Sequence, residues 1–328
     1  MSAPAATAHV TSLRRAAVRA TLAPSVHNTQ PWRLHLTGNR LDVYADRTRQ
    51  LAVLDPSSRQ LLISCGCAVM NARVSMAGSG VGVDVRRNPH PMHDDLLSSL
   101  TPADGPPDHD LAALDPVIEV RQTNRRHFAD DQVPRQILQV LQTAAILEDA
   151  FLYVVDGSDQ RAVVAGLSQR ADDIENLNPA YRAELRAWTS AEPGRRDGIS
   201  PLAVPHVDGT AQDEVPIRDF DTSGKGWLPA ATRSSKNQTL ALLCTAGDSP
   251  AEWLRAGEAL ERVLLEIARH GYSASPLTQV TEVPSARAQL RSELKLVGYP
   301  HVLLRIGRAP VAPSSRRRRL TDVLVDES

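Results

Sequence analysis

The sequence is short of cysteine, of charge imbalance and of long apolar runs, and each shortage excludes a class of protein. Its 328 residues include three cysteines, an odd number that argues against a disulfide framework and favours a reducing compartment. The 37 basic and 38 acidic side chains leave a net charge of −1, too little to attract nucleic acid over the whole surface. No uninterrupted apolar stretch approaches the roughly 18 residues that span a bilayer, and none follows Arg14 and Arg15 as in a secretory signal. We therefore expect a cytoplasmic protein that acts on small molecules, without nucleic-acid or membrane partners.

Several catalytic motifs are also missing. The sequence contains no HExxH, no GxSxG and no phosphate loop ending in GK[ST], which removes the key residues of metalloproteases, serine hydrolases and P-loop nucleotide phosphatases. The glycines of 78–82 end a predicted helix and lead into a strand, the reverse of a dinucleotide-binding loop. Cys65 and Cys67 have no second ligand pair at zinc spacing and are interpreted as small core residues. No metal site is predicted.

What is present is an average globular composition, 42% hydrophobic and 23% charged, in a length that suits one large domain or two ordinary ones. Helical and strand periodicities mix without strict alternation, which predicts an α+β fold. The segment 189–233 is rich in Gly, Pro, Asp and Ser and resembles a lid or binding loop. Helices are expected at 10–22, 56–78, 134–145, 159–176, 179–188 and 284–296. A further helix is expected to begin at the capping box Ser249-Pro250-Ala251-Glu252 and to end at Gly271. Strands are expected at 32–36, 41–45, 81–85, 151–155, 239–245 and 302–306.

A polar loop at 24–32 lies between a predicted helix and a predicted strand. Pro24 and Pro31 stiffen it, and Ser25, Asn28 and Gln30 supply hydrogen-bond donors and acceptors. Such a loop suits the edge of a planar heterocycle. An ordinary turn with a self-capping asparagine explains the same residues.

Two arginine-rich segments are candidates for phosphate binding. Residues 121–128 place a hydroxyl and an amide among three arginines, a set that matches phosphate oxygens, although a solvated charged turn is the plainer interpretation. The run 316–319 consists of four arginines near the C-terminus. It suits either a nucleic-acid tail or the return of one or two cations to a phosphate held elsewhere.

These segments resemble motifs of the nitroreductase superfamily. Residues 24–32, PSVHNTQPW, are similar to its PSxxNxQPW flavin loop, and residues 121–128, RQTNRRHF, are similar to its RxSxRxF phosphate motif with Thr123 in the serine place. The stretches 55–59 with 64–66 and 253–260 resemble the actinobacterial Acg-type branch. The resemblance implies a nitroreductase-like fold that binds FMN.

The order of the two motifs departs from the family. An ordinary nitroreductase is a homodimer whose single chain carries the phosphate motif first, whereas here the flavin loop precedes it, and the helix before that loop has no convincing RxSxRxF. The stretch 143–150, which should match the flavin loop in the second half, has lost its motif. The resemblance thus implies tandem fused halves, 1–118 and 119–328, that form an intramolecular pseudo-dimer with one FMN. The chain would be a monomer or a further homodimer.

The resemblance also assigns roles to individual residues. It implies that flavin chemistry is done by the cofactor, so no side chain is named as catalytic. Arg125 is expected beside the N1–O2 edge of the flavin, where a cation stabilises the reduced ring. The expected cofactor-binding residues are Ser25, Asn28 and Gln30 at the ring, Arg121, Thr123 and Asn124 with Arg125 in the phosphate motif, Pro276, Leu277 and Thr278 over the flavin face, and Arg317 and Arg318 at the phosphate.

Three functions compete at this stage. The first is an FMN-dependent oxidoreductase that passes hydride from NAD(P)H through flavin N5 to an electron-poor acceptor such as a nitroaromatic or a quinone. The second is an FMN store or sensor in which segment 189–233 closes over the flavin and little turnover occurs. The third, a nucleic-acid binder led by the arginine run, is disfavoured by the neutral surface charge.

Overall fold

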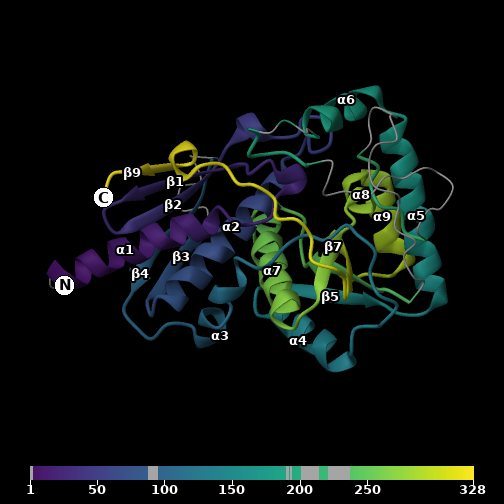
Figure 1. Cartoon of the computed structure of the whole chain (residues 1–328). Helices are drawn as coiled ribbons and strands as arrows, with labels where there is room; N and C mark the ends of the chain where they lie inside the picture. The colour runs from purple at the N-terminus through teal and green to yellow at the C-terminus, as the bar shows by residue number, and fades with distance from the viewer. Residues whose placement is uncertain (1–2, 88–94, 190–191, 193, 201–213, 221–236) are drawn as a thin grey trace.

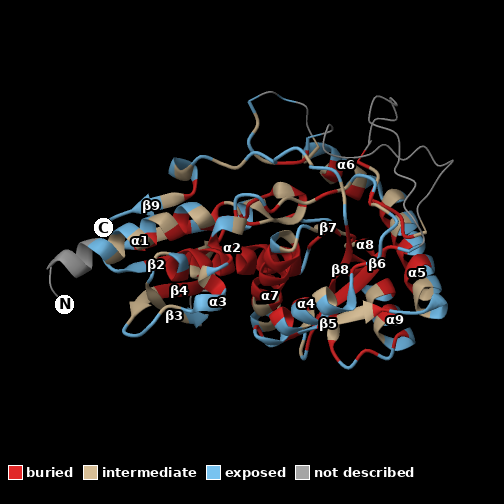
Figure 2. Cartoon of the chain, turned by 60° about the horizontal axis from the view of Figure 1, so that its bottom comes forward, coloured by how far each residue is buried: buried red, intermediate tan, exposed pale blue. Residues whose placement is uncertain are grey.

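A computed structural model of the 328-residue chain describes residues 3–87, 95–189, 192, 194–200, 214–220 and 237–328. Two β-sheets lie on either side of a central pair of long helices, α2 (Arg59–Gly78) and α7 (Pro250–Arg269) (Figure 1). Both central helices are buried over most of their length, as their colour in Figure 2 shows.

The first sheet is built mainly by the N-terminal half and has the strand order β3-β4-β2-β1-β9. Trp32, Leu34 and Leu36 of its strand β1 are fully buried and alternate with more exposed residues, the period expected of a strand with one face in the core. The helices of this half are α1 (Ala3–Ala20), α2 and the short α3 (His109–Ala112), and the strands are β1 (Trp32–Thr37), β2 (Arg40–Ala45), β3 (Gly82–Arg87), β4 (Leu96–Ala103) and β9 (Leu324–Asp326).

The second sheet has the strand order β5-β6-β8-β7, with antiparallel neighbours throughout. Its central strand β6 is buried at every residue and β8 at nearly every residue, because helices cover both faces. The strands are β5 (Ala150–Val155), β6 (Thr239–Thr245), β7 (Ser273–Pro276) and β8 (Tyr299–Gly307), and the helices are α4 (Arg135–Ile146), α5 (Ser158–Asn176), α6 (Pro179–Ala187), α7, α8 (Gln279–Glu282) and α9 (Pro284–Glu293).

The two central helices cross at a pair of glycines. A Cβ atom on Gly66 would lie 2.1 Å from the carbonyl oxygen of Leu254, and one on Gly257 would lie 2.0 Å from the carbonyl oxygen of Ile63. Each glycine therefore meets the carbonyl three residues before the other glycine, which is the pattern of a two-fold axis between the helices. Only glycine permits this close approach, because any side chain would overlap the backbone of the partner helix.

This contact sets a register between the halves. Since 257 − 66 = 191, a residue of α2 corresponds to the residue 191 positions later in α7, and this shift carries the bounds 59–78 onto 250–269. The strands follow the same rule of correspondence, since β3-β4-β2-β1 in one sheet matches β7-β8-β6-β5 in the other. The expected fusion of two similar halves is thus visible in the topology.

The C-terminal segment returns from the second half to the first. Strand β9 pairs parallel with β1, Leu34 opposite Leu324, and adds a fifth strand to the first sheet (Figure 1). A division of the chain at residues 118 and 119 places β9 with the second half in sequence, whereas hydrogen bonding places it in the first sheet.

Most predicted elements are confirmed, β6 with its predicted bounds and α7 beginning directly after Ser249. Strands β4, β7 and β9 were not predicted, and β7 contains Pro276, which was expected over the flavin face. One helix of the described residues, α2, is long and apolar enough to cross a bilayer by length and composition alone. In the structure 89% of the most apolar window of α2 is buried inside the protein, so it is a core helix.

Candidate functional site

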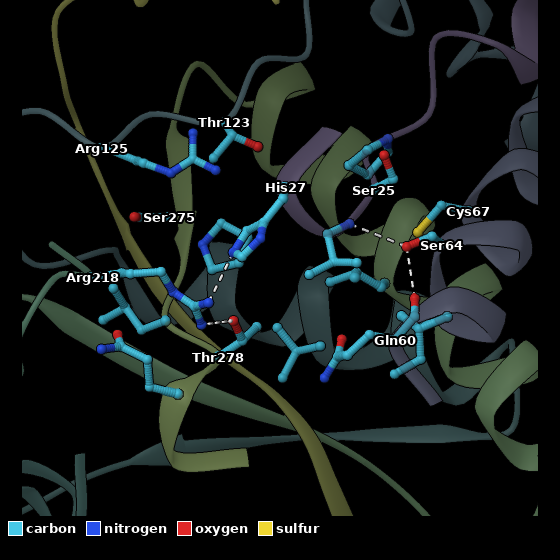
Figure 3. Close-up of a pocket in the computed structure, with 18 of the residues that line it drawn as sticks. Ser25, His27, Gln60, Ser64, Cys67, Thr123, Arg125, Arg218, Ser275 and Thr278 are labelled. Atoms are coloured by element: carbon cyan, nitrogen blue, oxygen red, sulfur yellow. Dashed lines mark hydrogen bonds between the residues drawn. The ribbon is translucent and has the colours of Figure 1, made fainter. Parts of the chain in front are cut away.

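A cavity lies between the two halves, beside the crossing of α2 and α7. It encloses about 800 Å³ of empty space, open solvent included. Six of the twelve residues predicted to hold the cofactor line it: Ser25, Thr123, Arg125, Pro276, Leu277 and Thr278. Figure 3 shows Ser25, Gln60, Ser64 and Cys67 of the first half on one side and Thr123, Arg125, Arg218 and Ser275 of the second half on the other.

The loop that precedes β1 is held in an unusual backbone conformation. His27, Asn28 and Gln30 all have positive φ angles, of 46°, 54° and 51°. The hydroxyl of Ser25 accepts a hydrogen bond from the backbone N–H of Gln30 at 2.9 Å, and the N–H of Val26 donates to the Ser64 hydroxyl of α2 at 3.2 Å. Strain of this kind persists only where surrounding contacts enforce it, and it collects at binding sites.

The arginine-rich segment at 121–128 runs beside strand β7. Thr123 forms a parallel β-bridge with Ala274, and the backbone N–H of Asn124 donates to the Ala274 carbonyl at 2.9 Å. The next residue of β7, Ser275, lines the cavity with a fully buried hydroxyl that has no hydrogen-bond partner in the described part of the chain. The pairing therefore delivers Thr123 and Arg125 to the cavity together with the segment after α7.

Two arginines bring positive charge into the cavity. Arg125 lies over the ring of Phe220, 5.5 Å from its centroid, and no carboxylate among the described residues pairs with it. Burial, and then the neighbouring Arg218, lower the pKa of Arg125 to about 10. Arg218 is compensated, because it donates to the carboxylate of Glu282, which raises its pKa despite burial. An uncompensated cation next to a compensated one favours an anionic ligand.

His27 is the residue between these walls in Figure 3. Its Nε2 lies 2.8 Å from a guanidinium nitrogen of Arg218, which can only donate, so the ring proton is assigned to Nδ1. Burial, and then the charges of Arg218 and Arg125, lower the pKa of His27 well below its usual value, so the ring is neutral. The buried Nδ1 has no partner among the described residues and is a free donor at the cavity.

A second group of charges lies next to the cavity, at one end of the α2–α7 crossing. Arg121 and Arg317 both donate to the carbonyl oxygen of Leu22, each at 3.2 Å. The Nε of Arg121 lies 3.3 Å from a carboxylate oxygen of Glu261, which is fully buried on α7. Cys67, which lines the cavity, is close enough for Glu261 and Arg121 to influence its thiol, whose pKa burial raises. The sequence prediction that Arg121 and Arg317 share one site is consistent with this convergence.

The other predicted residues lie near the cavity without lining it. The side chain of Asn28 binds the carbonyls of Gly198 and Arg316 and accepts from Arg317 at 3.1 Å. Gln30 is fully buried, and its amide accepts from the backbone N–H of Arg318 at 2.7 Å. These two residues fasten the C-terminal segment to the flavin-loop segment.

Two further members of the predicted set are also occupied with the polypeptide. The Asn124 side chain donates to the Pro310 carbonyl at 2.6 Å, and the Arg318 guanidinium donates to the carbonyl oxygens of Gln30 and Asp322. Their roles toward a ligand stay predictions, and in the structure they are positioning residues.

Sequence reasoning missed several polar residues at or beside this cavity, among them His27, Arg218 and Glu261. His27 lies within the flavin-loop motif at 24–32, but at a position where the motif specifies no residue type. Arg218 lies in a stretch without periodicity, and Glu261 lies on the buried side of a helix whose pattern drew attention to its leucines. The partner that identifies each residue is far away in sequence: Arg218 for His27, and Arg121 for Glu261.

Part of the segment predicted as a lid lines the cavity. Ile217, Arg218 and Phe220 line it and are 4–7% exposed, and Arg218 is tied to His27 and Glu282. Of the predicted range 189–233, residues 190–191, 193, 201–213 and 221–233 lie outside the described residues.

No protein-family model matches the chain. A protein of Mycobacterium tuberculosis strain H37Rv, named "Putative NAD(P)H nitroreductase Rv3131", is 31% identical over 320 residues, which are 95% of this chain and 91% of the relative. The chain belongs to the nitroreductase family. A second relative from the same strain, named "Putative NAD(P)H nitroreductase acg", is 29% identical over 308 residues, 92% of this chain and 91% of its own, so the Acg-type resemblance is confirmed as well.

More distant likenesses exist among solved structures of nitroreductases. The FMN-dependent nitroreductase NfnB from Mycobacterium smegmatis, in complex with NADPH, is 16% identical with a TM-score of 0.40 and covers 65% of this chain and 97% of its own. A nitroreductase with bound FMN from Bacteroides fragilis is 12% identical with a TM-score of 0.37 and covers 63% of this chain and 93% of its own.

Proposed function

We propose that this nitroreductase-family protein is an FMN-dependent oxidoreductase that takes reducing equivalents from NAD(P)H and passes them to an electron-poor acceptor. The observation that carries the proposal is the cavity between the halves, which unites the PSVHN loop of one half with Thr123 and Arg125 of the other. The family relatives are named NAD(P)H nitroreductases, and the M. smegmatis NfnB structure contains NADPH.

The polar atoms of the site fit a flavin phosphate and ring. The Nε atoms of Arg121 and Arg317 are buried and have no hydrogen-bond partner among the described residues, and both side chains converge on one point. Guanidinium groups in such a pair bind phosphate oxygens well. Around the cavity, the free His27 Nδ1 and Ser275 hydroxyl offer polar contacts to ring heteroatoms.

Each wall then has a task. Arg121, Thr123 and Arg317 would hold the phosphate, and Arg125 would stabilise negative charge on the ring. The apolar side chains of Ile63, Leu260 and Leu264 from the two central helices would pack against the ligand and exclude water. Bound FMN would supply the hydride chemistry, accepting a hydride from the nicotinamide at N5 and delivering it to a nitroaromatic or quinone.

The experiment that tests this is an anaerobic visible spectrum of the flavin-loaded protein before and after addition of NADPH. We expect the oxidised-flavin band to bleach and to return when a nitroaromatic or quinone is added. Protein that neither contains flavin nor takes up added FMN would overturn the proposal.

Arg121 and Arg317 are here called the phosphate clamp, and a substitution in this pair tests how FMN would be bound. Arg121→Ala should weaken FMN binding by more than about 1.5 kcal/mol, because it removes a charge-assisted contact. Arg126→Ala is the matched control, since Arg126 is exposed in the same segment and does not line the cavity. Equal FMN affinity of both variants would remove Arg121 from the site.

A second candidate, an FMN store with little turnover, is favoured by one observation. Ile217, Arg218 and Phe220 cover the cavity, and Arg218 is anchored to Glu282 at one wall. In a store, NADPH would leave the flavin band unchanged in the intact protein. Arg218→Ala would then loosen this cover and allow bleaching.

A further inference from the structure

Glu261 is a buried acid next to Arg121 and Arg317, the two arginines of the phosphate clamp. It is fully buried on α7, and its carboxylate oxygen lies 3.3 Å from the Nε of Arg121. Arg317 is close enough for the Glu261 charge to influence its pKa, which burial lowers to about 9. Without a ligand, the carboxylate is therefore the one acidic counter-charge that the described residues provide for this pair of cations.

The position is exceptional when the two central helices are compared. The register of 191 residues places Glu261 opposite Met70 of α2, which is fully buried among apolar side chains. The packing of the central helices therefore does not require a carboxylate at this position, since an apolar Met70 occupies it in α2. We attribute the acid in α7 to the clamp, which only one of the two halves possesses.

The surroundings of Glu261 contain few other titratable groups. From α2 the thiol of Cys67 and the amide of Asn71 face it. Arg121 faces it from the arginine-rich segment 121–128, and Arg317 faces it from the C-terminal segment. Burial raises the pKa of Glu261 to about 7, although the arginines oppose this rise. Burial also raises the pKa of Cys67, which keeps that thiol neutral.

We propose that Glu261 is the proton-linked counter-ion of the clamp: when a phosphorylated flavin binds, Glu261 takes up one proton, Arg121 turns from the Glu261 carboxylate to the phosphate, and Arg317 binds the phosphate as well. This inference rests on the proposed function and adds a selection rule to it. A flavin without a phosphate leaves the Glu261 carboxylate paired with Arg121 and causes no proton uptake.

The sign of the linkage follows from charge. A phosphate dianion next to a carboxylate in a buried site raises the pKa of the carboxylate further, because like charges repel. From pH 7 to pH 8 the ionised fraction of Glu261 in the free protein rises from about one half to about nine tenths, while the complex holds Glu261 protonated. FMN affinity therefore falls as the pH rises, by up to about tenfold per unit. The phosphate ester itself titrates near pH 6, below this range.

The test is isothermal titration of FMN into the flavin-free protein at pH 7.5, in two buffers of different ionisation enthalpy. We expect uptake of about 0.8 proton per FMN bound, the ionised fraction that a pKa of about 7 predicts. Riboflavin, which occupies the ring site without a phosphate, should bind with no uptake. At pH 8, Glu261→Gln should bind FMN about tenfold more tightly than the wild type and without proton uptake.

Glu266→Gln is the matched control, because Glu266 lies on the same helix and pairs with the surface residues Arg269 and His270. It should retain the proton uptake of the wild type. FMN binding without uptake in the wild type, or equal uptake with FMN and riboflavin, would overturn the role of Glu261 and leave the proposed function standing. The two-flavin comparison needs no variant, so it decides the matter even if Glu261→Gln does not fold. If FMN does not bind at all, the proposed function and this inference both fail.

Discussion

The two halves of the molecule share one scaffold and differ in what fills it. Each has a helix, two paired strands, a long central helix and two further strands, in the same sheet order. They differ in their connections: the first helix and strand are joined by residues 21–31 in one half and by 147–149 in the other, and the strand pair is joined by the turn 38–39 or by 156–238. The scaffold is thus shared, and the connecting loops carry the difference.

The same register of 191 residues identifies what occupies the position equivalent to the cavity on the other side of the pseudo-axis. Cys67 and Leu264 line the cavity, and their counterparts across the pseudo-axis are Glu258 and Arg73. Arg73 pairs with Glu258 at 2.7 Å and with Glu148, from the short connection 147–149, at 2.5 Å. On one side of the pseudo-axis the two halves enclose a cavity, and on the other side they are joined by buried ion pairs.

This comparison teaches why one ligand site per chain is expected. Arg262 and Arg87 complete the network through Glu148 and Glu258. Like the clamp of Arg121 and Arg317, the network keeps a buried donor without a hydrogen-bond partner, the Nε of Arg262, so the difference lies in the ion pairs that fill the place of the cavity. The asymmetry predicts one FMN per chain, and the fused halves already supply the interface that a separate subunit would otherwise provide.

Breaking the network should have the largest effect. Arg73→Met would leave Glu148 and Glu258 buried with fewer partners, and we expect the free energy of unfolding to fall by about 3–5 kcal/mol. Denaturant titration measures this loss, and FMN should still bind at one per chain. Arg255→Met is the control on α7: its ion pairs are long and exposed, so its loss should stay below about 0.5 kcal/mol. A second FMN bound by either protein would contradict the comparison.

Perturbing the crossing should have the next largest effect. Gly66→Ala forces a methyl group against the Leu254 carbonyl, and overpacking of this kind costs about 2–3 kcal/mol. Thermal or denaturant unfolding measures it. In contrast, Gly166→Ala on α5 meets nothing within 4 Å and should stabilise the protein by up to about 1 kcal/mol. Equal stability of the two variants would show that the helices do not approach as described.

Removing a helix cap should have the smallest effect and sharpens the comparison between the central helices. The Ser249 hydroxyl accepts from the Glu252 N–H of α7 at 3.4 Å, whereas the first turn of α2 is capped by Asp55, which accepts from Leu61 at 2.9 Å. Ser249→Ala should cost about 0.5–1 kcal/mol in a denaturant titration. Ser292→Ala, an exposed serine on α9, serves as the reference. A loss no larger than that of the reference would mean that proline at Pro250 suffices to start the helix.

Local patterns predicted much of this fold, and distant pairings account for what they missed. The Ser249–Glu252 capping box located the start of α7, and a run of apolar residues located β6, because both signals depend on neighbours in sequence. Strand β9 has three residues and exists only through its pairing with β1. No periodicity can emerge from so short a segment.

The site was predicted in part for the same reason. The motifs located Ser25, Thr123 and Arg125, which line the cavity, since each motif is contiguous. Asn28 and Gln30 belong to the same loop, yet their side chains form hydrogen bonds with the C-terminal segment, which lies outside the motif. The charge compensation of Glu261 depends on residues 140 and 56 positions away along the chain (261 − 121 and 317 − 261).

The return of the C-terminus to the first half has a consequence for synthesis on the ribosome. The first half emerges early, but its fifth strand and Arg317 are translated only after strands β5 to β8 of the second half. The N-terminal sheet must therefore wait with an open edge while the second half is made, and a chain that terminates early lacks both the closing strand and one arm of the phosphate clamp. Cofactor retention would in this way separate finished chains from unfinished ones.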